Sequence, residues 1–472
     1  MRDIMFALTW AALIPASLLA AQVGVLLWVW TALLSPADVL IGFMASVPLN
    51  KAIAGVTFVR MFISREKLDR YFDATLKLVT LLGIAATLSW LNAIVSADAN
   101  TDLYFKLMKV IALVFVISAV MTSRSRIHLL VLTVVIALGF NAVKEGAIFL
   151  LSAGGHVIAG NGSIGDNNSL ATALLMIVPL TAYLIRRSAV RLVRAGLIGV
   201  LVLCLVTVVA TYSRGGFVGL LVLGGFMLKN SRHKLASAGL VLAVVAVVYF
   251  TAPDTWFQRV GTLESADQDM SFMNRVSAWK ISLLIALDHP FLGGGPHSVQ
   301  QSAVWLAYRP FLAMVDFVTT PPAIATPMAA HSIYFEILGD LGFTGLGVFL
   351  SLLGATFWNL HKIGKMAAGH PSLAWAVDLA RMLQISMVIY MVTGAALSMG
   401  YFEMAYVLIA IVSRTRRTVL LSLAAMNADQ AVLAAAPNKL QQTQLVRPGF
   451  GYADAPIGAR LDGAAPHPGH AR

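Results

Sequence analysis

The feature that most constrains this chain is a series of apolar stretches that recurs from the N-terminus to about residue 413. Runs of about 18 or more apolar residues match the length of helix that crosses a bilayer. Of the 472 residues, 58% are hydrophobic and 12% are charged, against about 25% charged residues in a typical soluble domain. Because every backbone N–H and C=O group in lipid needs an internal partner, the spans are predicted to be helices.

Twelve or thirteen spans are predicted, because the first two runs are short and can form one bent unit. The runs cover residues 4–20, 22–35, 39–60, 74–96, 104–122, 128–151, 169–185, 193–211, 216–228, 235–252, 332–357, 376–397 and 401–413. The first run resembles a signal peptide, but more apolar chain follows at once and favours an uncleaved span. The predicted fold is therefore an all-α, polytopic integral membrane protein.

Basic residues occur in every second connection between these spans, over most of the chain. Such an excess of Lys and Arg is typical of cytoplasmic loops. The basic connections contain Arg60, Arg65, Lys67 and Arg70; Arg124 and Arg126; Arg186, Arg187, Arg191 and Arg194; Lys229, Arg232 and Lys234; Lys362 and Lys365; and Arg414, Arg416 and Arg417. The formal net charge of +12 therefore indicates orientation in a membrane rather than binding to nucleic acid.

The other connections are predicted to face outward, and one of them is long. Pro253–Ala330 spans about 78 residues, and connections of that length are usually functional or disordered. Its aromatic residues predict an ordered, packed loop. The chain is thus divided into an N-terminal transmembrane region (1–150), a second transmembrane domain that includes this loop (151–426) and a disordered cytoplasmic tail (427–472) rich in Ala, Pro and Gly. The single Cys204 excludes an internal disulfide.

One candidate functional residue is Arg214, in the short outward turn Thr211–Gly216 between two spans. No other basic residue is near it in the sequence. A charge at a membrane boundary is costly unless it is paired or hydrated, so such a residue is a functional candidate by default. An arginine that extends its side chain to the interface is an equally weighted alternative.

A second candidate is Arg275, at the start of a predicted amphipathic helix from Asn274 to about Leu287. Arg275 and Trp279 are four residues apart and therefore share one face of that helix. The alternative is a helix that lies on the bilayer surface with Trp279 as its interfacial anchor.

A glycine-rich turn, Pro290–Gly295, then breaks the helix. Glycines allow a tight turn with exposed N–H groups, and such groups can bind an anion. Gly294 and Gly295 are therefore candidate ligands of a substrate anion, although a glycine run alone is a weak signal.

The third candidate is His331, at the outward start of the next span, with Tyr334 and Phe335 on the same helical face. A histidine at a helix start is more often a polar residue of the cap region. Two outward arginines and one histidine, without an acidic cluster in the sequence nearby, suit a diphosphate anion held by Arg, with His as base.

Other motifs give no alternative site. Asp267 and Asp269 resemble a metal-binding pair but lack a third ligand, and Asp166 begins a span as a helix N-cap or lines a polar cavity. No Walker A motif, His/Cys metal cluster or nucleophile elbow occurs. No metal or other cofactor is therefore expected, and the energy for any reaction has to come from the substrate.

The order and spacing of these motifs resemble the O-antigen ligase and polymerase superfamily over roughly residues 160–415. The resemblance is carried by Ser213-Arg214-Gly215, by Arg275 and Trp279, by Pro290–Gly295, and by His331 with Tyr334, Leu338, Gly342 and Gly345. Separately, Gly24–Trp30 is similar to O-glycosylation ligases associated with exosortase A systems. The turn continues Gly295-Pro296-His297 where relatives often have a further small residue and an aromatic one, so the glycan-recognition side of the loop is unassigned.

The resemblance implies a glycosyltransferase of the bacterial inner membrane with its site facing the periplasm. Its donor would be a glycan linked to undecaprenyl diphosphate, and its acceptor a hydroxyl group of a protein, lipid or glycan. Arg214 and Arg275 would bind the diphosphate and His331 would activate the acceptor, with Trp279 and Tyr334 beside them. The reaction would be inverting and would need neither metal nor ATP.

Three alternatives remain open at the level of sequence. A polysaccharide polymerase needs the same diphosphate site as a ligase. A transporter or flippase of lipid-linked glycans would show internal repeats and broken helices at the bilayer midplane, and no clear repeat is found. A structural membrane scaffold would leave the outward arginines and histidine unexplained.

Overall fold

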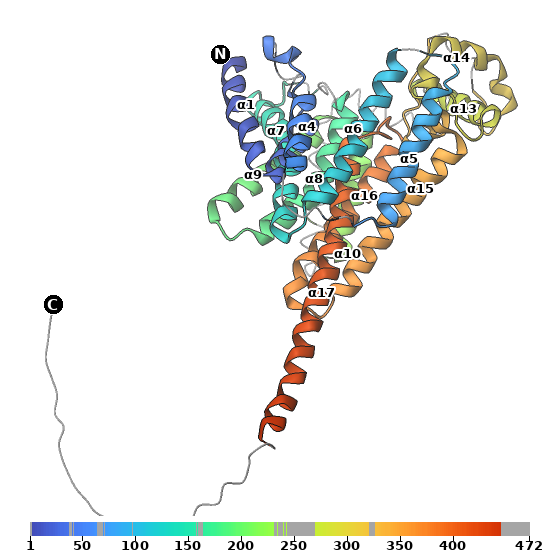
Figure 1. Ribbon diagram of the computed structural model, residues 1–472. Coiled ribbons are helices and arrows are strands. Elements are labelled where there is room, and N and C mark those ends of the chain that lie inside the picture. Colours follow the sequence, from blue (N-terminus) through green and yellow to red (C-terminus); the bar gives the residue numbers. More distant parts are fainter. Residues whose placement is uncertain are drawn as a thin grey trace, which may run out of the picture. The chain divides into compact units, whose positions relative to one another are not determined.

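A computed structural model shows that the chain is helical and divides into two compact units, Met1–Leu420 and Leu421–Arg472 (Figure 1). It describes residues 2–36, 40, 42–63, 69, 71–96, 98–156, 158, 164–230, 234, 239, 242, 270–320 and 326–444. Within these ranges there is no β-strand. The predicted all-α fold is therefore confirmed, and the long apolar helices described below support its polytopic membrane character.

The described ranges contain fourteen α-helices. Their bounds are α1 Arg2–Leu19, α2 Ala21–Leu34, α4 Leu49–Ile63, α5 Ala74–Leu91, α6 Asp98–Val120, α7 Arg124–Leu151, α8 Asn167–Arg187, α9 Arg191–Ala210, α10 Arg214–Asn230, α13 Met270–Asp288, α14 Ser302–Tyr308, α15 Ile333–Ala367, α16 Ala374–Gly394 and α17 Glu403–Gln444. Short 3₁₀ helices lie between them, and these are η1 Phe43–Ser46, η3 Ser298–Gln300, η4 Arg309–Met314 and η5 Pro371–Leu373.

Seven of the described helices are long and apolar enough to cross a membrane: α5, α6, α7, α8, α9, α15 and α16. The helices α1 and α2 are apolar but shorter. The predicted span 235–252 lies outside the described residues, except for residues 239 and 242. The count of twelve or thirteen spans therefore stays a prediction.

Two helices extend well beyond the predicted elements. The helix α15 continues to Ala367, ten residues past the predicted end of its span at residue 357. The helix α17 continues to Gln444 and thus through the first part of the predicted tail. Ala and Gln are the most frequent residues of this extension and favour a helix. Residues 445–472 of the predicted tail lie outside the described residues.

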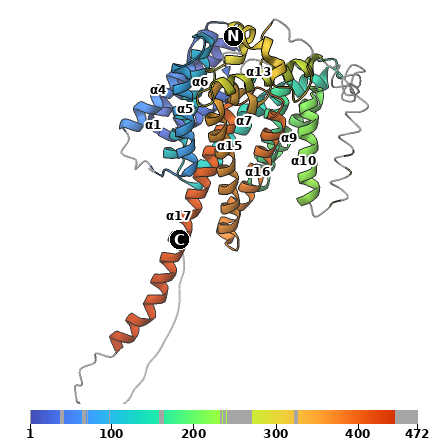
Figure 2. The same ribbon diagram turned by 90° about the vertical axis from the view of Figure 1, so that its right-hand side faces the viewer.

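Burial separates the helices of the first unit into central and peripheral ones. In α8, 83% of the apolar window is buried, because α8 packs against α7, α9, α10 and α16. In α9 only 22% is buried, so most of its apolar surface is left to face lipid. The helix α15 packs against α5, α13 and α16, and both views show α13 at one end of this group (Figure 1, Figure 2).

The connections between the helices fall into two sets according to the hydrogen bonds and ion pairs that join them, as the alternation of basic loops predicts. Within the set predicted to be cytoplasmic, the bonded pairs are Arg187 with Asp378, Arg416 with Asn359, and Arg414 with Asp69. Within the set predicted to face outward, they are Ile94 with Gly294, Asn167 with Thr211, and His331 with Ser398. The grouping agrees with the prediction; which set faces the cytoplasm remains a prediction.

Residues 270–320 of the predicted long loop fold as a small helical lobe. Its buried cluster consists of Ala278, Ile281, Leu284, Ile285, Val299, Val304, Trp305 and Leu312. The buried Lys280 Nζ lies 3.2 Å from Asp316 Oδ1, which ties α13 to the chain after η4. The prediction that the loop packs is thus confirmed for 270–320, whereas Pro253 to residue 269 lies outside the described residues.

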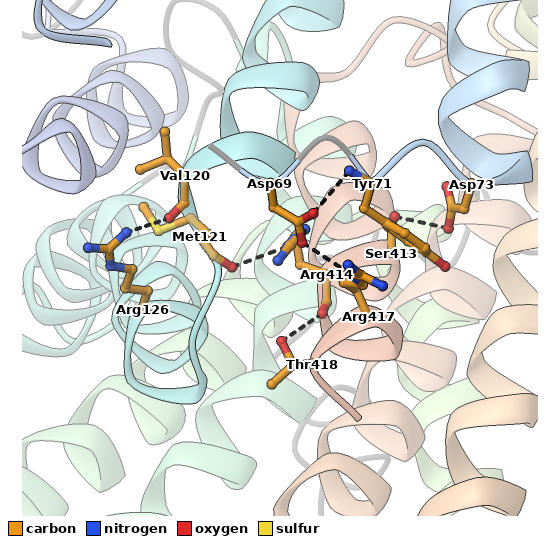
Figure 3. Close-up of polar contacts among 10 residues, drawn as sticks. All are labelled: Asp69, Tyr71, Asp73, Val120, Met121, Arg126, Ser413, Arg414, Arg417 and Thr418. Carbon is orange, nitrogen blue, oxygen red and sulfur yellow. Dashed lines mark hydrogen bonds and ion pairs between the residues drawn. The ribbon is translucent and has the colours of Figure 1, made fainter. Parts of the chain in front are cut away.

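At the predicted cytoplasmic side, one fully buried arginine joins three segments (Figure 3). Arg414 Nη1 lies 2.9 Å from Asp69 Oδ2 in the connection before α5, and its Nε donates to the Met121 carbonyl after α6 at 3.3 Å. Arg417 Nε approaches the same oxygen of Asp69 at 3.2 Å. Burial raises the pKa of Asp69, but Arg414 and Arg417 outweigh it and bring that pKa below its usual value.

Replacing Arg414 by Met is expected to destabilise the protein strongly. Breaking a buried ion pair by removing one partner typically costs about 3–5 kcal/mol, and the remaining Arg417 should reduce this loss. The measurement is the thermal unfolding midpoint in detergent micelles, with Arg381→Met at an exposed position of α16 as the control. The double variant with Asp69→Asn should lose less than the sum of the single losses; additive losses would show that the pair does not contribute.

Candidate functional site

His331 stands directly before α15 in a strained backbone conformation. Its φ of 45° lies in the left-handed region, which costs about 1–3 kcal/mol for residues other than glycine and persists only where the surroundings enforce it. The His331 N–H group donates to Ser398 Oγ at 2.9 Å, in the turn between α16 and α17. The surrounding structure therefore fixes the main chain that carries the half-buried imidazole of His331.

The helix α13 meets the start of α15 through Trp279. The Trp279 Nε1–H group donates to the Ala330 carbonyl at 2.6 Å, and its ring stacks on Phe335 with centroids 5.2 Å apart and planes 6° from parallel. Arg275 lies one turn earlier on the same face of α13. The structure therefore brings the predicted residues Arg275, Trp279 and His331 into one region.

The electrostatics of His331 follow from this placement. Burial lowers the pKa of His331 below its usual value of about 6.5, and the positive charge of Arg275 lowers it further. The carboxylate of Asp166 acts in the opposite direction but does not cancel these effects. The imidazole is accordingly neutral at pH 7 and can accept a proton.

Arg214 is the first residue of α10 and follows a turn that is fixed to the start of α8. Ser213 Oγ donates to Asn168 Oδ1 at 2.6 Å, and Asn167 Nδ2 donates to the Thr211 carbonyl at 3.0 Å. The neighbouring Asp166 caps α8 by accepting the Ser169 N–H at 2.7 Å, as one of its two predicted roles requires. Because Asp166 also acts on His331, the segment 166–168 connects the Arg214 turn with the His331 region.

Tyr334, another predicted substrate ligand, uses its hydroxyl within the protein. The hydroxyl donates to the Met391 carbonyl of α16 at 3.1 Å. Tyr334 therefore joins α15 to α16 one turn after His331. Its ring, rather than its hydrogen-bond donor, remains for a substrate contact.

The geometry of the glycine turn does not support the predicted anion ligands Gly294 and Gly295. The Gly294 N–H donates to the Gly339 carbonyl at 2.8 Å, and the Gly295 N–H donates to the Asp340 carbonyl at 3.1 Å. All three glycines of this turn are buried. The N–H groups of Gly294 and Gly295 are thus bonded to α15, and that of Gly293 is bonded to the His289 carbonyl, so none of the three is presented to a ligand.

The turn instead fills a break in α15 at Gly342, whose φ of 68° and ψ of −170° are not helical. The Phe343 N–H donates to the Pro290 carbonyl at 2.8 Å, across the break. A Cβ at Gly293 would lie 2.5 Å from the Gly342 nitrogen, and a Cβ at Gly342 would lie 2.7 Å from the Pro290 oxygen. Only glycine permits this approach of two backbones.

Two buried carboxyl groups in α15 escaped the sequence analysis. Glu336 and Asp340 are four residues apart and are 8% and 2% exposed. Acidic residues within an apolar span are a functional signal by themselves, so they could have been selected. Asp267 and Asp269 lie outside the described residues. In the part of the chain that the structure describes, no three His, Cys, Asp or Glu side chains form a metal site.

Replacing Gly293 by Ala should destabilise the protein, because it opposes both the left-handed φ of 66° and the contact with Gly342. The backbone term alone is about 1–3 kcal/mol. The unfolding midpoint in detergent micelles measures the effect. Gly347→Ala in α15 is the matched control, since a Cβ there meets no atom within 4 Å. Equal midpoints for the two variants would show that the break is not constrained as described.

The titration of His331 gives a second test. In NMR spectra of protein with ¹³C-labelled histidine, His331, assigned from the spectrum of His331→Ala, should titrate below pH 6.5. Arg275→Gln removes the nearby positive charge, so the midpoint of His331 should move upward. Arg381→Gln serves as the control for a general change of charge. An unchanged midpoint in Arg275→Gln would contradict the proximity of the two side chains.

Comparison with known families adds two matches. Residues 199–350 match the family described as O-antigen ligase, which covers Arg214, Arg275, His331 and the break in α15. Residues 1–189 match a second family, whose function is unknown. None of the curated proteins matches the chain. The chain is thus a multi-pass membrane protein whose residues 199–350 match the O-antigen ligase family, and this match supports a place in the O-antigen ligase and polymerase superfamily.

Proposed function

We propose that the chain is a membrane glycosyltransferase that transfers a glycan from an undecaprenyl-diphosphate carrier to an acceptor hydroxyl at the periplasmic face of the inner membrane. The observation that carries this proposal is that Trp279 joins the helix of Arg275 to the chain at His331, within the residues that match the O-antigen ligase family, and that burial and Arg275 both lower the pKa of His331. A base and a permanent cation in one region match the two charges that such a transfer creates.

In the proposed reaction, the acceptor oxygen attacks the anomeric carbon of the donor glycan. The bond from that carbon to the diphosphate oxygen breaks, and the diphosphate leaves with the electron pair. The acceptor proton passes to the imidazole of His331, which is the general base. One in-line displacement inverts the anomeric configuration and needs no covalent glycosyl-enzyme.

The arginines are assigned to the leaving group. The guanidinium of Arg275 matches phosphate oxygens in geometry and stays charged at any relevant pH. Arg214 begins α10 in the turn held by Asn167 and Asn168, and we assign it to the same diphosphate. Preorganised cations stabilise the charge that develops on the departing group, so the proposed reaction requires neither metal nor nucleotide.

The ring of Trp279 is the proposed platform for the donor, together with the ring of Tyr334. The acceptor is proposed to be a hydroxyl of a protein, which follows from the resemblance of Gly24–Trp30 to O-glycosylation ligases. A lipid or glycan acceptor, or a polymerase that extends one lipid-linked glycan with another, uses the same site. Acceptor competition assays separate these cases.

One observation bears on the transporter alternative. Broken helices are typical of transporters, and α15 is broken at Gly342. This break, however, is filled by the backbone of the turn Pro290–Gly295 rather than left open to a substrate. It therefore argues for a fixed helix pair and not for a moving gate.

The decisive experiment measures transfer from purified lipid-diphosphate glycan, without added metal or nucleotide. His331→Ala should lower the rate about 10²–10⁴-fold, as expected for loss of a general base. Arg275→Ala and Arg214→Ala should each lower it about 10²–10³-fold, as expected for loss of a charge-stabilising donor. His370→Ala and Arg381→Ala change exposed residues of the same types and serve as controls.

Normal transfer by all three site variants would refute the assignment of this site. A wild-type protein that moves glycolipid between leaflets but forms no glycosidic bond would establish the transporter instead. Reconstitution into vesicles with the donor on one side distinguishes these two results.

A further inference from the structure

The turn between α16 and α17 is held on several sides by buried side chains. The Met399 carbonyl accepts the hydroxyl of Tyr390 at 2.8 Å, and the Gly400 carbonyl accepts the hydroxyl of Tyr406 at 2.9 Å. Both tyrosines are almost fully buried. The turn is therefore fixed from α16 and from α17, and it carries Ser398, the acceptor for the His331 N–H.

Glu336 holds the same turn from α15. Its Oε2 accepts the Gly400 N–H at 2.8 Å, and its side chain is buried in the first turn of the helix. A Cβ at Gly400 would lie 3.0 Å from that oxygen, so a side chain at this position would crowd the contact. Three helices thus converge on the few peptide groups next to Ser398.

The neighbouring carboxyl group has a different partner. Asp340 Oδ1 accepts the Ser298 N–H at 3.2 Å, and Asp340 Oδ2 accepts the hydroxyl of Tyr401 at 3.1 Å. Asp340 therefore holds the chain that follows the glycine turn and also, through Tyr401, the turn between α16 and α17. Glu336 differs from Asp340 because it bonds the main chain of that turn, at Gly400, two residues after Ser398.

We propose that Glu336 is a positioning residue for His331. Its carboxyl oxygen fixes the peptide of Gly400, the turn then fixes Ser398, and Ser398 holds the strained main chain of His331 so that the imidazole meets the acceptor hydroxyl. This inference rests on the proposed role of His331 as general base. It requires the oxygen of Glu336 as a hydrogen-bond acceptor and does not require its charge.

Variants of Glu336 can separate a requirement for its acceptor oxygen from a requirement for its charge. Glu336→Gln keeps a carbonyl oxygen for the Gly400 N–H and should retain kcat within about threefold, a loss that corresponds to about 0.7 kcal/mol. Glu336→Leu removes the acceptor and should lower kcat about 10–100-fold with little change in the KM of the donor, since a small misplacement of a catalytic group can cost about 10²-fold. Ser398→Ala should act in the same direction, and Ser398→Thr should restore the rate.

A double variant separates positioning from a general structural defect. In the His331→Ala background, Glu336→Leu should cause no further loss of the residual rate, because the base that it positions is absent. A general defect would lower the residual rate as well. All variants are compared at equal amounts of monodisperse protein, with Asp102→Asn, at an exposed position of α6, as the control carboxyl substitution.

The NMR titration of His331 tests the positioning without turnover. Glu336→Leu and Ser398→Ala should shift the midpoint of His331, whereas Glu336→Gln should leave it unchanged. An unshifted midpoint with normal kcat in Glu336→Leu, while His331→Ala is inactive, would overturn the positioning role alone. Equal damage by Glu336→Gln and Glu336→Leu would overturn it in favour of a role for the charge. If His331→Ala is fully active while Glu336→Leu shifts the midpoint of His331, the proposed function is overturned instead.

Discussion

The geometry of the candidate site depends on the backbone contact between the turn Pro290–Gly295 and the break in α15. A helix that is interrupted at Gly342 exposes N–H and C=O groups, which cannot remain unpaired in an apolar environment. The turn supplies their partners through its own backbone. Since the turn directly follows α13, this contact fixes α13 to α15, and with them Arg275 to His331.

Features that depend on local chemistry were predictable from the sequence. The length of apolar runs predicted helices such as α8 and α16 to within a few residues, because lipid permits few alternatives for the backbone. Arg275 and Trp279 were placed on one helical face by their spacing alone. The alternation of basic loops predicted which connections meet, since positive charge and membrane side are physically linked.

Features that depend on a partner distant in sequence were not predictable. Gly294 and Gly295 suggested an anion site because a glycine turn has N–H groups to offer, but nothing in their spacing shows that α15 accepts those groups. In the sequence, Gly342 contributed to the family resemblance, and the break of α15 at this residue became visible only with the opposing backbone. The roles of Glu336 and Asp340 likewise depend on the turns that reach them.

The placement of charge gives the two ends of the first unit different properties. At the predicted cytoplasmic side, Asp69 compensates Arg414, so a buried charge serves to join segments. At the other side, Arg275 lies near a histidine whose protonation it opposes. The guanidinium that is proposed to bind a diphosphate therefore acts together with burial, the larger effect, to lower the pKa of His331, so that both proposed roles are compatible at one pH.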